Sequence, residues 1–114
     1  MPSKKDPAAA LVHIAENIRF AQKLIADMSY EEFRDNQTVF YAATRALEII
    51  SEASRRVAPA IKARHAHIPW ADVAGAGNIY RHDYEDVQQK LIWGTIQKRL
   101  PELLAIVEAE IAPQ

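Results

Sequence analysis

The chain contains no cysteine, and this absence removes several kinds of structure and chemistry. Without thiols there is no disulfide framework, no thiolate metal site and no cysteine nucleophile. The fold must therefore be held together by packing alone.

An excess of charge of one sign is also missing. Fourteen Lys and Arg residues face fifteen Asp and Glu residues, which leaves a formal net charge of -1. This balance excludes the strongly basic surface of a dedicated nucleic-acid binder. Any contact with RNA must be local.

Long apolar runs and export signals are absent as well. No apolar run approaches the length of a membrane span. The N-terminus lacks the apolar core and the cleavage site of a secretory signal. With 114 residues, the chain suits one domain over residues 1–114, with flexible ends at about 1–6 and 112–114. We expect it to be cytoplasmic, with no membrane contact.

Helical periodicity dominates what is present. Apolar residues between Pro7 and Met28 recur at spacings of three and four, which predicts a long amphipathic helix. Ser29 and Glu32 have the spacing of a capping box and predict a short helix. The residues expected to face inward on the long helix are Leu11, Ile14, Ala15, Ile18, Ala21, Leu24, Ile25 and Met28.

A second long helix is predicted after Asp35 or Asn36, either of which can cap it. Pro59 ends or bends that helix and can open a short one that runs to Arg64. The predicted buried stripe of the long helix is Val39, Ala43, Ala46, Leu47, Ile50, Ala53 and Val57.

Two further helices complete the chain. One restarts at 68–70 and meets Gly75 and Gly77, each of which costs about 1 kcal/mol relative to alanine in a helix. The last runs from after 84–86 to about Ala109, with a kink or break expected near 98–100 because Pro101 lies inside it. Its predicted inward residues are Leu91, Ile92, Ile96, Leu100, Leu103, Leu104 and Val107. The fold class is therefore all-α, a small antiparallel bundle of four to five helices.

His82 is the histidine best placed for chemistry, because it lies where the glycine-interrupted helix is expected to end. If the backbone there is extended, His82 and Tyr84 project to the same side, next to Arg81. An imidazole can move the proton of a ribose 2′-hydroxyl, and a guanidinium can hold a phosphate. By contrast, His65 and His67 favour a solvated basic loop, and no metal site is expected.

Polar residues on the second long helix carry two further interpretations. Arg45 and Glu48 lie between core positions, which favours a partly buried ion pair at a bundle seam or dimer contact. Charge runs are usually solvated, and contact with an RNA backbone is the less favoured alternative. The residues of that basic run are Arg55, Arg56, Lys62 and Arg64.

Four segments follow one another along the chain: 28–33 (Met-Ser-Tyr-Glu-Glu-Phe), 45–53 (Arg-Ala-Leu-Glu-Ile-Ile-Ser-Glu-Ala), 68–70 (Ile-Pro-Trp) and 100–103 (Leu-Pro-Glu-Leu). Together they resemble the HepT-like toxin family of the HEPN superfamily, and the resemblance covers nearly the whole chain. The resemblance implies a HEPN-like bundle and a metal-independent endoribonuclease without a cofactor. It also implies that the site is completed across a homodimer.

The family motif is Arg, four residues, His, one residue and Tyr, usually with Asn directly after the Arg. Asn78, His82 and Tyr84 match it, whereas Gly77 occupies the position of the Arg. Arg81 could substitute as a catalytic residue, and Arg45 or Arg55 of either subunit could serve as well. The resemblance thus implies His82 as a catalytic residue, and we take Arg81 as the candidate for the second one. The residues that would support the site or contact RNA are Asn78, Asp83, Arg45, Glu48 and Arg55.

The resemblance also implies a partner, a small MNT-type nucleotidyltransferase antitoxin. In related pairs this enzyme transfers AMP to the motif tyrosine, here Tyr84. The added negative phosphodiester would repel an RNA backbone. Two interpretations stay open: a ribonuclease toxin that uses His82, and a non-catalytic helical dimer that engages the nucleotidyltransferase or a nucleotide.

Overall fold

A computed structural model describes the backbone of residues 7–82 and 85–112, and the side chains of residues 9–77 and 87–112. Within these ranges the chain is helical and contains no strand, which confirms the all-α prediction. The elements are α1 (Pro7–Ile25), α2 (Tyr30–Arg34), α3 (Gln37–Ser54), α4 (Pro59–Arg64), α5 (Trp70–His82), α6 (Glu85–Gly94), η1 (Thr95–Arg99) and α7 (Leu100–Ile111).

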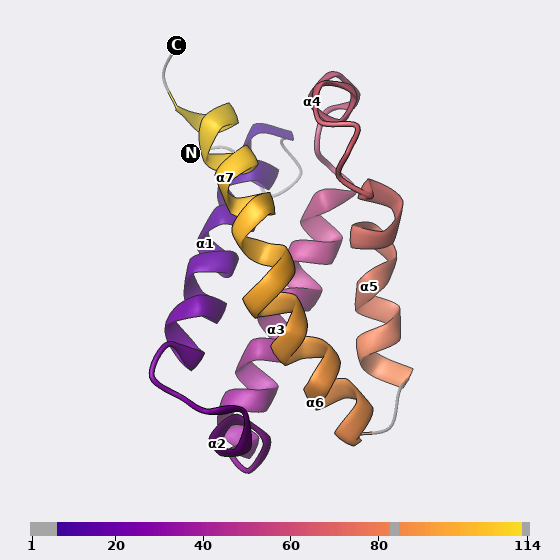
Figure 1. The fold of residues 1–114 in the computed structure, drawn as a ribbon. Coiled ribbons are helices and arrows are strands. Elements are labelled where there is room, and N and C mark those ends of the chain that lie inside the picture. The colour runs from indigo at the N-terminus through magenta and orange to yellow at the C-terminus, as the bar shows by residue number, and fades with distance from the viewer. Residues whose placement is uncertain (1–6, 83–84, 113–114) are drawn as a thin grey trace.

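The long segments form an antiparallel bundle (Figure 1). Helices α1, α3 and α5 alternate in direction, and α6, η1 and α7 together make the last segment. The short helices α2 and α4 lie at opposite ends of the bundle. Helix α3 is central, because it packs against both α1 and α5. The predicted flexible ends fall largely outside the described residues.

The first half of the chain follows its sequence signals closely. The stripe on α1 is buried apart from the half-buried Leu24, and the helix stops at Ile25, before Met28. At the start of α2 the Ser29 hydroxyl accepts the Glu32 amide at 3.1 Å. The Glu32 carboxylate accepts the Ser29 amide at 2.9 Å. The capping box is therefore confirmed.

Helix α3 begins where the sequence indicates, with the Asn36 side chain accepting the Val39 amide at 3.0 Å. Its predicted stripe is buried except for the half-buried Val39. Phe40 and two serines, Ser51 and Ser54, are also buried, and periodicity did not predict them. Small polar residues can be buried at low cost when each hydroxyl finds a hydrogen-bond partner.

The last segment changes its helical type just before Pro101. Residues Thr95–Arg99 form a π-helical turn, in which the Leu100 amide donates to the Thr95 carbonyl. Proline has no amide hydrogen and its ring crowds the preceding turn, so a local widening of the helix relieves the clash. The predicted irregularity is confirmed, and it begins three residues earlier than expected.

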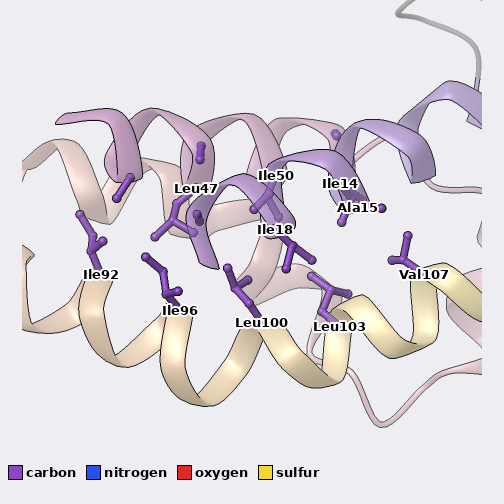
Figure 2. Packing of buried hydrophobic residues seen from close by; sticks show 14 of the residues in the cluster. Ile14, Ala15, Ile18, Leu47, Ile50, Ile92, Ile96, Leu100, Leu103 and Val107 are labelled. Carbon is purple, nitrogen blue, oxygen red and sulfur yellow. The ribbon is translucent and has the colours of Figure 1, made fainter. Parts of the chain in front are cut away.

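The core lies between α1 and α3 on one side and the last segment on the other (Figure 2). Figure 2 shows Ile18 and Leu47 facing Ile96 and Leu100 across it. At the α2 end, the fully buried Phe33 packs edge-on against Phe40 at 6.1 Å and lies 5.4 Å from the Trp93 ring. These aromatic contacts join α2 to α3 and α6.

Helix α5 continues through both glycines and ends at His82, where the sequence predicted its end. It starts at Trp70, whose indole donates to the His65 carbonyl at 3.0 Å, and its backbone stays helical to His82. Both glycines have ordinary helical backbone angles. Among the described helices, none is long and apolar enough to cross a membrane.

Candidate functional site

The motif segment lies at the C-terminal end of α5. Because the backbone of residues 78–82 is helical, the extended arrangement considered for this segment does not apply up to His82. Asp83 and Tyr84 lie outside the described residues, as do the side chains of Asn78, Arg81 and His82. The predicted patch of imidazole, guanidinium and phenol therefore stays a prediction.

One turn before the motif, α5 is bonded directly to α3 through Ser51. The Ser51 hydroxyl donates to the Ala74 carbonyl at 2.7 Å and accepts the Gly77 amide at 3.1 Å. Arg55 adds a second donor to the Ala74 carbonyl at 2.9 Å. Three hydrogen bonds thus join Ser51 of α3 and Arg55, the residue that caps the C-terminal end of α3, to the α5 backbone; we call this set the α3–α5 clamp.

Gly77 makes the clamp possible. It is buried, and a Cβ atom at this position would lie 3.2 Å from the Ser51 hydroxyl oxygen and 3.4 Å from the Ser51 Cβ. The first distance is shorter than most contacts of a Cβ atom and the second is ordinary, so a side chain here would press on the Ser51 hydroxyl. Gly75 has no neighbour within 4 Å of a built Cβ. Close helix contact is therefore a physical reason for glycine at 77 but not at 75.

A groove of about 600 Å³ lies next to the clamp, between α3, α5 and the last segment, and Ser51 is one of its lining residues. Its floor is apolar and includes Leu47, Ile50 and Leu103. Lys98 and Arg99 line its rim on the η1 side and are exposed. Leu91, predicted to face inward, also lines this groove and is 37% exposed.

The polar residues of α3 do not behave as one set. Arg45 is exposed and Glu48 is half-buried, and the salt bridges between described side chains do not join them. Arg56 pairs with Glu52 at 3.3 Å in the usual one-turn geometry. Arg55 is exposed, yet its guanidinium donates a hydrogen bond to the Ala74 carbonyl. The expected Arg45–Glu48 pair is therefore not confirmed.

An ionic cluster ties the α4 end to α7. The Glu110 side chain, 11% exposed, binds Arg64 at 2.6 Å and the His65 ring at 2.8 Å. Hydrogen bonds from Arg64 and then His65 lower the pKa of Glu110 from 4.5 to about 2. His65 is half-buried, so the predicted solvated loop is wrong for this residue, whereas His67 is exposed. No group of three or more metal-binding side chains occurs among the described residues.

Comparison with known proteins identifies the family. The model of a family described as "Ribonuclease HepT-like" matches residues 14–110, which include all of α2 to α6 and nearly all of α7. The chain belongs to the HepT-like ribonuclease family. This confirms the resemblance drawn from the motifs.

Individual HepT-like relatives match over nearly their full lengths. A protein of Methanocaldococcus jannaschii named "Putative RNase MJ1380" is 34% identical, over 93% of this chain and 97% of its own. One of Caldanaerobacter subterraneus subsp. tengcongensis named "Putative RNase TTE0752" is 33% identical, over 87% and 88%. "Probable ribonuclease HepT" of Thermococcus cleftensis is 32% identical, over 82% and 84%. No solved structure matches the chain significantly.

Two features of this HepT-like chain gave little signal in the sequence. Ser51 is one of several small residues on α3, and only the position of α5 shows that its hydroxyl bonds another helix. Glu110 lies 45 residues from His65, so no local spacing links them. The small residues at 74–77 were the available hint, because small side chains permit close helix contact.

Proposed function

We propose that this HepT-like chain is the toxin of a toxin–antitoxin pair and cleaves RNA with His82. The observation that carries the proposal is the match of the chain to the HepT-like ribonuclease family together with the presence of His82 at the motif position. Three relatives whose names include RNase or ribonuclease support the activity. The groove beside α5 supplies open surface next to the helix that ends at His82.

In the proposed reaction, the His82 imidazole accepts the proton of a ribose 2′-hydroxyl. The 2′-oxygen attacks the adjacent phosphorus, the bond to the 5′-oxygen of the next nucleotide breaks, and that oxygen takes up a proton. The products are a 2′,3′-cyclic phosphate and a 5′-hydroxyl. A positioned imidazole contributes about a hundredfold or more to such a step, and a guanidinium stabilises the charge on the phosphate oxygens.

The guanidinium must come from a residue other than 77, which is glycine here. Arg55 is a weak candidate, because its guanidinium already donates to the Ala74 carbonyl. Arg45 is exposed on α3 and is available to a neighbouring subunit. Arg81 is next to His82 in the sequence. We therefore favour Arg81, with Arg45 of a second copy as the alternative within a homodimer.

The partner we propose is an MNT-type nucleotidyltransferase that silences the toxin by transferring AMP to Tyr84. The phenol oxygen would attack the α-phosphorus of ATP, and pyrophosphate would leave. The resulting phosphodiester adds bulk and negative charge two residues from His82, where it would repel an RNA backbone.

A second function, a non-catalytic HEPN dimer that engages the nucleotidyltransferase or a nucleotide, is favoured by one observation. Gly77 lacks the side chain of the motif Arg, and the clamp leaves little room for one. The two functions differ in whether the chain alone cuts RNA.

His82→Ala tests the choice directly. For a ribonuclease toxin, the substitution should abolish growth inhibition and RNA cleavage while unfolding free energy changes by no more than about 1 kcal/mol. Tyr84→Phe should keep toxicity but escape the antitoxin. A wild-type chain that is harmless alone and cuts no RNA would leave the non-catalytic function. Light scattering at tens of micromolar tests the dimer, and a strictly monomeric mass would contradict it.

A further inference from the structure

The Ser51 hydroxyl uses its donor and one acceptor position on the backbone of another helix. Ser51 is 3% exposed, and its oxygen lies 2.7 Å from the Ala74 oxygen and 3.1 Å from the Gly77 nitrogen. A serine hydroxyl has one hydrogen to donate, so the direction of both bonds is fixed by the geometry. Ser51 thus contacts α5 at two points three residues apart, nearly one helical turn.

Apart from its contacts with α3, few contacts between described elements determine the position of α5. Among the described elements α3 is the main neighbour of α5, and the open groove, which Ser51 also lines, leaves part of α5 uncovered between α3 and the last segment. Arg55 adds its bond to the same Ala74 carbonyl. The rotation and axial position of α5 are therefore determined largely by α3 residues at the clamp.

We propose that Ser51 is a positioning residue for the His82 site. His82 follows Gly77 by five residues on one continuous helix, a rise of about 7.5 Å. Over so short a distance a helix behaves as a rigid body, so a shift at the clamp moves the His82 backbone by a similar amount. A displacement of about 1 Å costs on the order of a hundredfold in rate. This inference rests on the proposed function of His82.

Ser51→Ala tests the role, with Ser54→Ala as its matched control. Ser54 is fully buried on the same helix, but its hydroxyl donates to the Ser51 carbonyl within α3. At 25 °C, where all variants are folded by circular dichroism, Ser51→Ala should lower kcat for RNA cleavage at least about tenfold with little change in KM. Ser54→Ala should stay within about twofold of wild type. Equal kcat values for both variants would overturn the proposal.

A second pair of variants keeps the test informative if Ser51→Ala does not fold. Gly77→Ala retains the hydroxyl but places a Cβ 3.2 Å from it, whereas Gly75→Ala meets no neighbour. The first should lower kcat and the second should not. A purely stabilising clamp would instead lower the melting temperature and leave kcat unchanged below it, which would refute a positioning role.

Amide chemical shifts separate this proposal from the proposed function. If the wild-type chain cuts no RNA, the ribonuclease proposal fails. The positioning role of Ser51 still predicts how Ser51→Ala changes the amide shifts of α5. Its amide shift changes should extend from Gly77 to His82, and those of Ser54→Ala should not. Changes confined to residues 74–77 would show that the clamp does not position His82.

Discussion

Alanine at the two glycines of α5 gives a sharp comparison, because both lie in one helix and only one faces α3. Helix propensity alone favours alanine over glycine by about 0.8–1.0 kcal/mol at either position. At Gly75 a new Cβ meets nothing within 4 Å, so the whole gain should appear. Gly75→Ala should raise the free energy of unfolding by about 1 kcal/mol.

At Gly77 the same gain is opposed by contact with Ser51. The Cβ would lie 3.2 Å from the hydroxyl oxygen, so Ser51 must shift and two hydrogen bonds weaken, each worth about 0.5–1.5 kcal/mol. Overpacking adds about 1 kcal/mol or more. Gly77→Ala should therefore be less stable than Gly75→Ala by about 2–3 kcal/mol. Gly77→Arg, which would restore the family motif, should be destabilised for the same reason.

Urea denaturation followed by circular dichroism measures these differences, and a third variant identifies their source. With Ser51→Ala present, the hydroxyl oxygen is gone and the remaining contact at 3.4 Å is ordinary. The difference in unfolding free energy between Gly77→Ala and Gly75→Ala should then largely disappear. Equal stabilisation by alanine at 75 and 77 in the wild-type background would refute the close-contact argument.

Two further outcomes are expected from the packing and the ionic cluster. Phe33→Ala removes a fully buried ring between Phe40 and Trp93 and should cost about 3–5 kcal/mol by denaturation, and a cost below about 1 kcal/mol would contradict the packing described. The Glu110 pKa of about 2 is below its ordinary value of 4.5, so between these two pH values the folded state binds fewer protons than the unfolded state. The stabilisation by Glu110 is present above about pH 4.5 and is lost as pH falls towards 2. Glu110→Gln should therefore weaken the dependence of the unfolding free energy on acid pH, relative to wild type and to Glu108→Gln. The same pH dependence in all three proteins would contradict this role of Glu110.

Local signals in the sequence predicted most of the fold. Ser29, Asn36 and Pro59 mark helix starts through capping hydrogen bonds or a fixed φ angle, and the structure places helices there. Pro101 predicted an irregular last helix for a steric reason that also holds in the structure.

Features that depend on contacts between distant residues were not predicted. The extended backbone considered for His82 is absent, because α5 stays helical to His82 and its packing on α3 offsets the low helix propensity of the two glycines. Leu91 has the period of a core residue, yet it lines the groove and stays partly exposed. For the candidate site, the sequence supplied His82 and the family motif, whereas the clamp through Ser51 required the structure.

The π-helical turn has a consequence for how α6 presents its side chains. A wide turn holds one residue more than the α-helical turn it replaces, and each α-helical residue rotates the chain by about 100°. Loss of one residue from Thr95–Arg99 could restore a regular helix without turning α6, whereas a regular α-helix that kept all five residues would turn α6 by about that angle relative to α7. Ile92 would then leave the core and a neighbouring side chain would replace it. The π-helical form of this turn thus determines which face of α6 borders the groove beside α5.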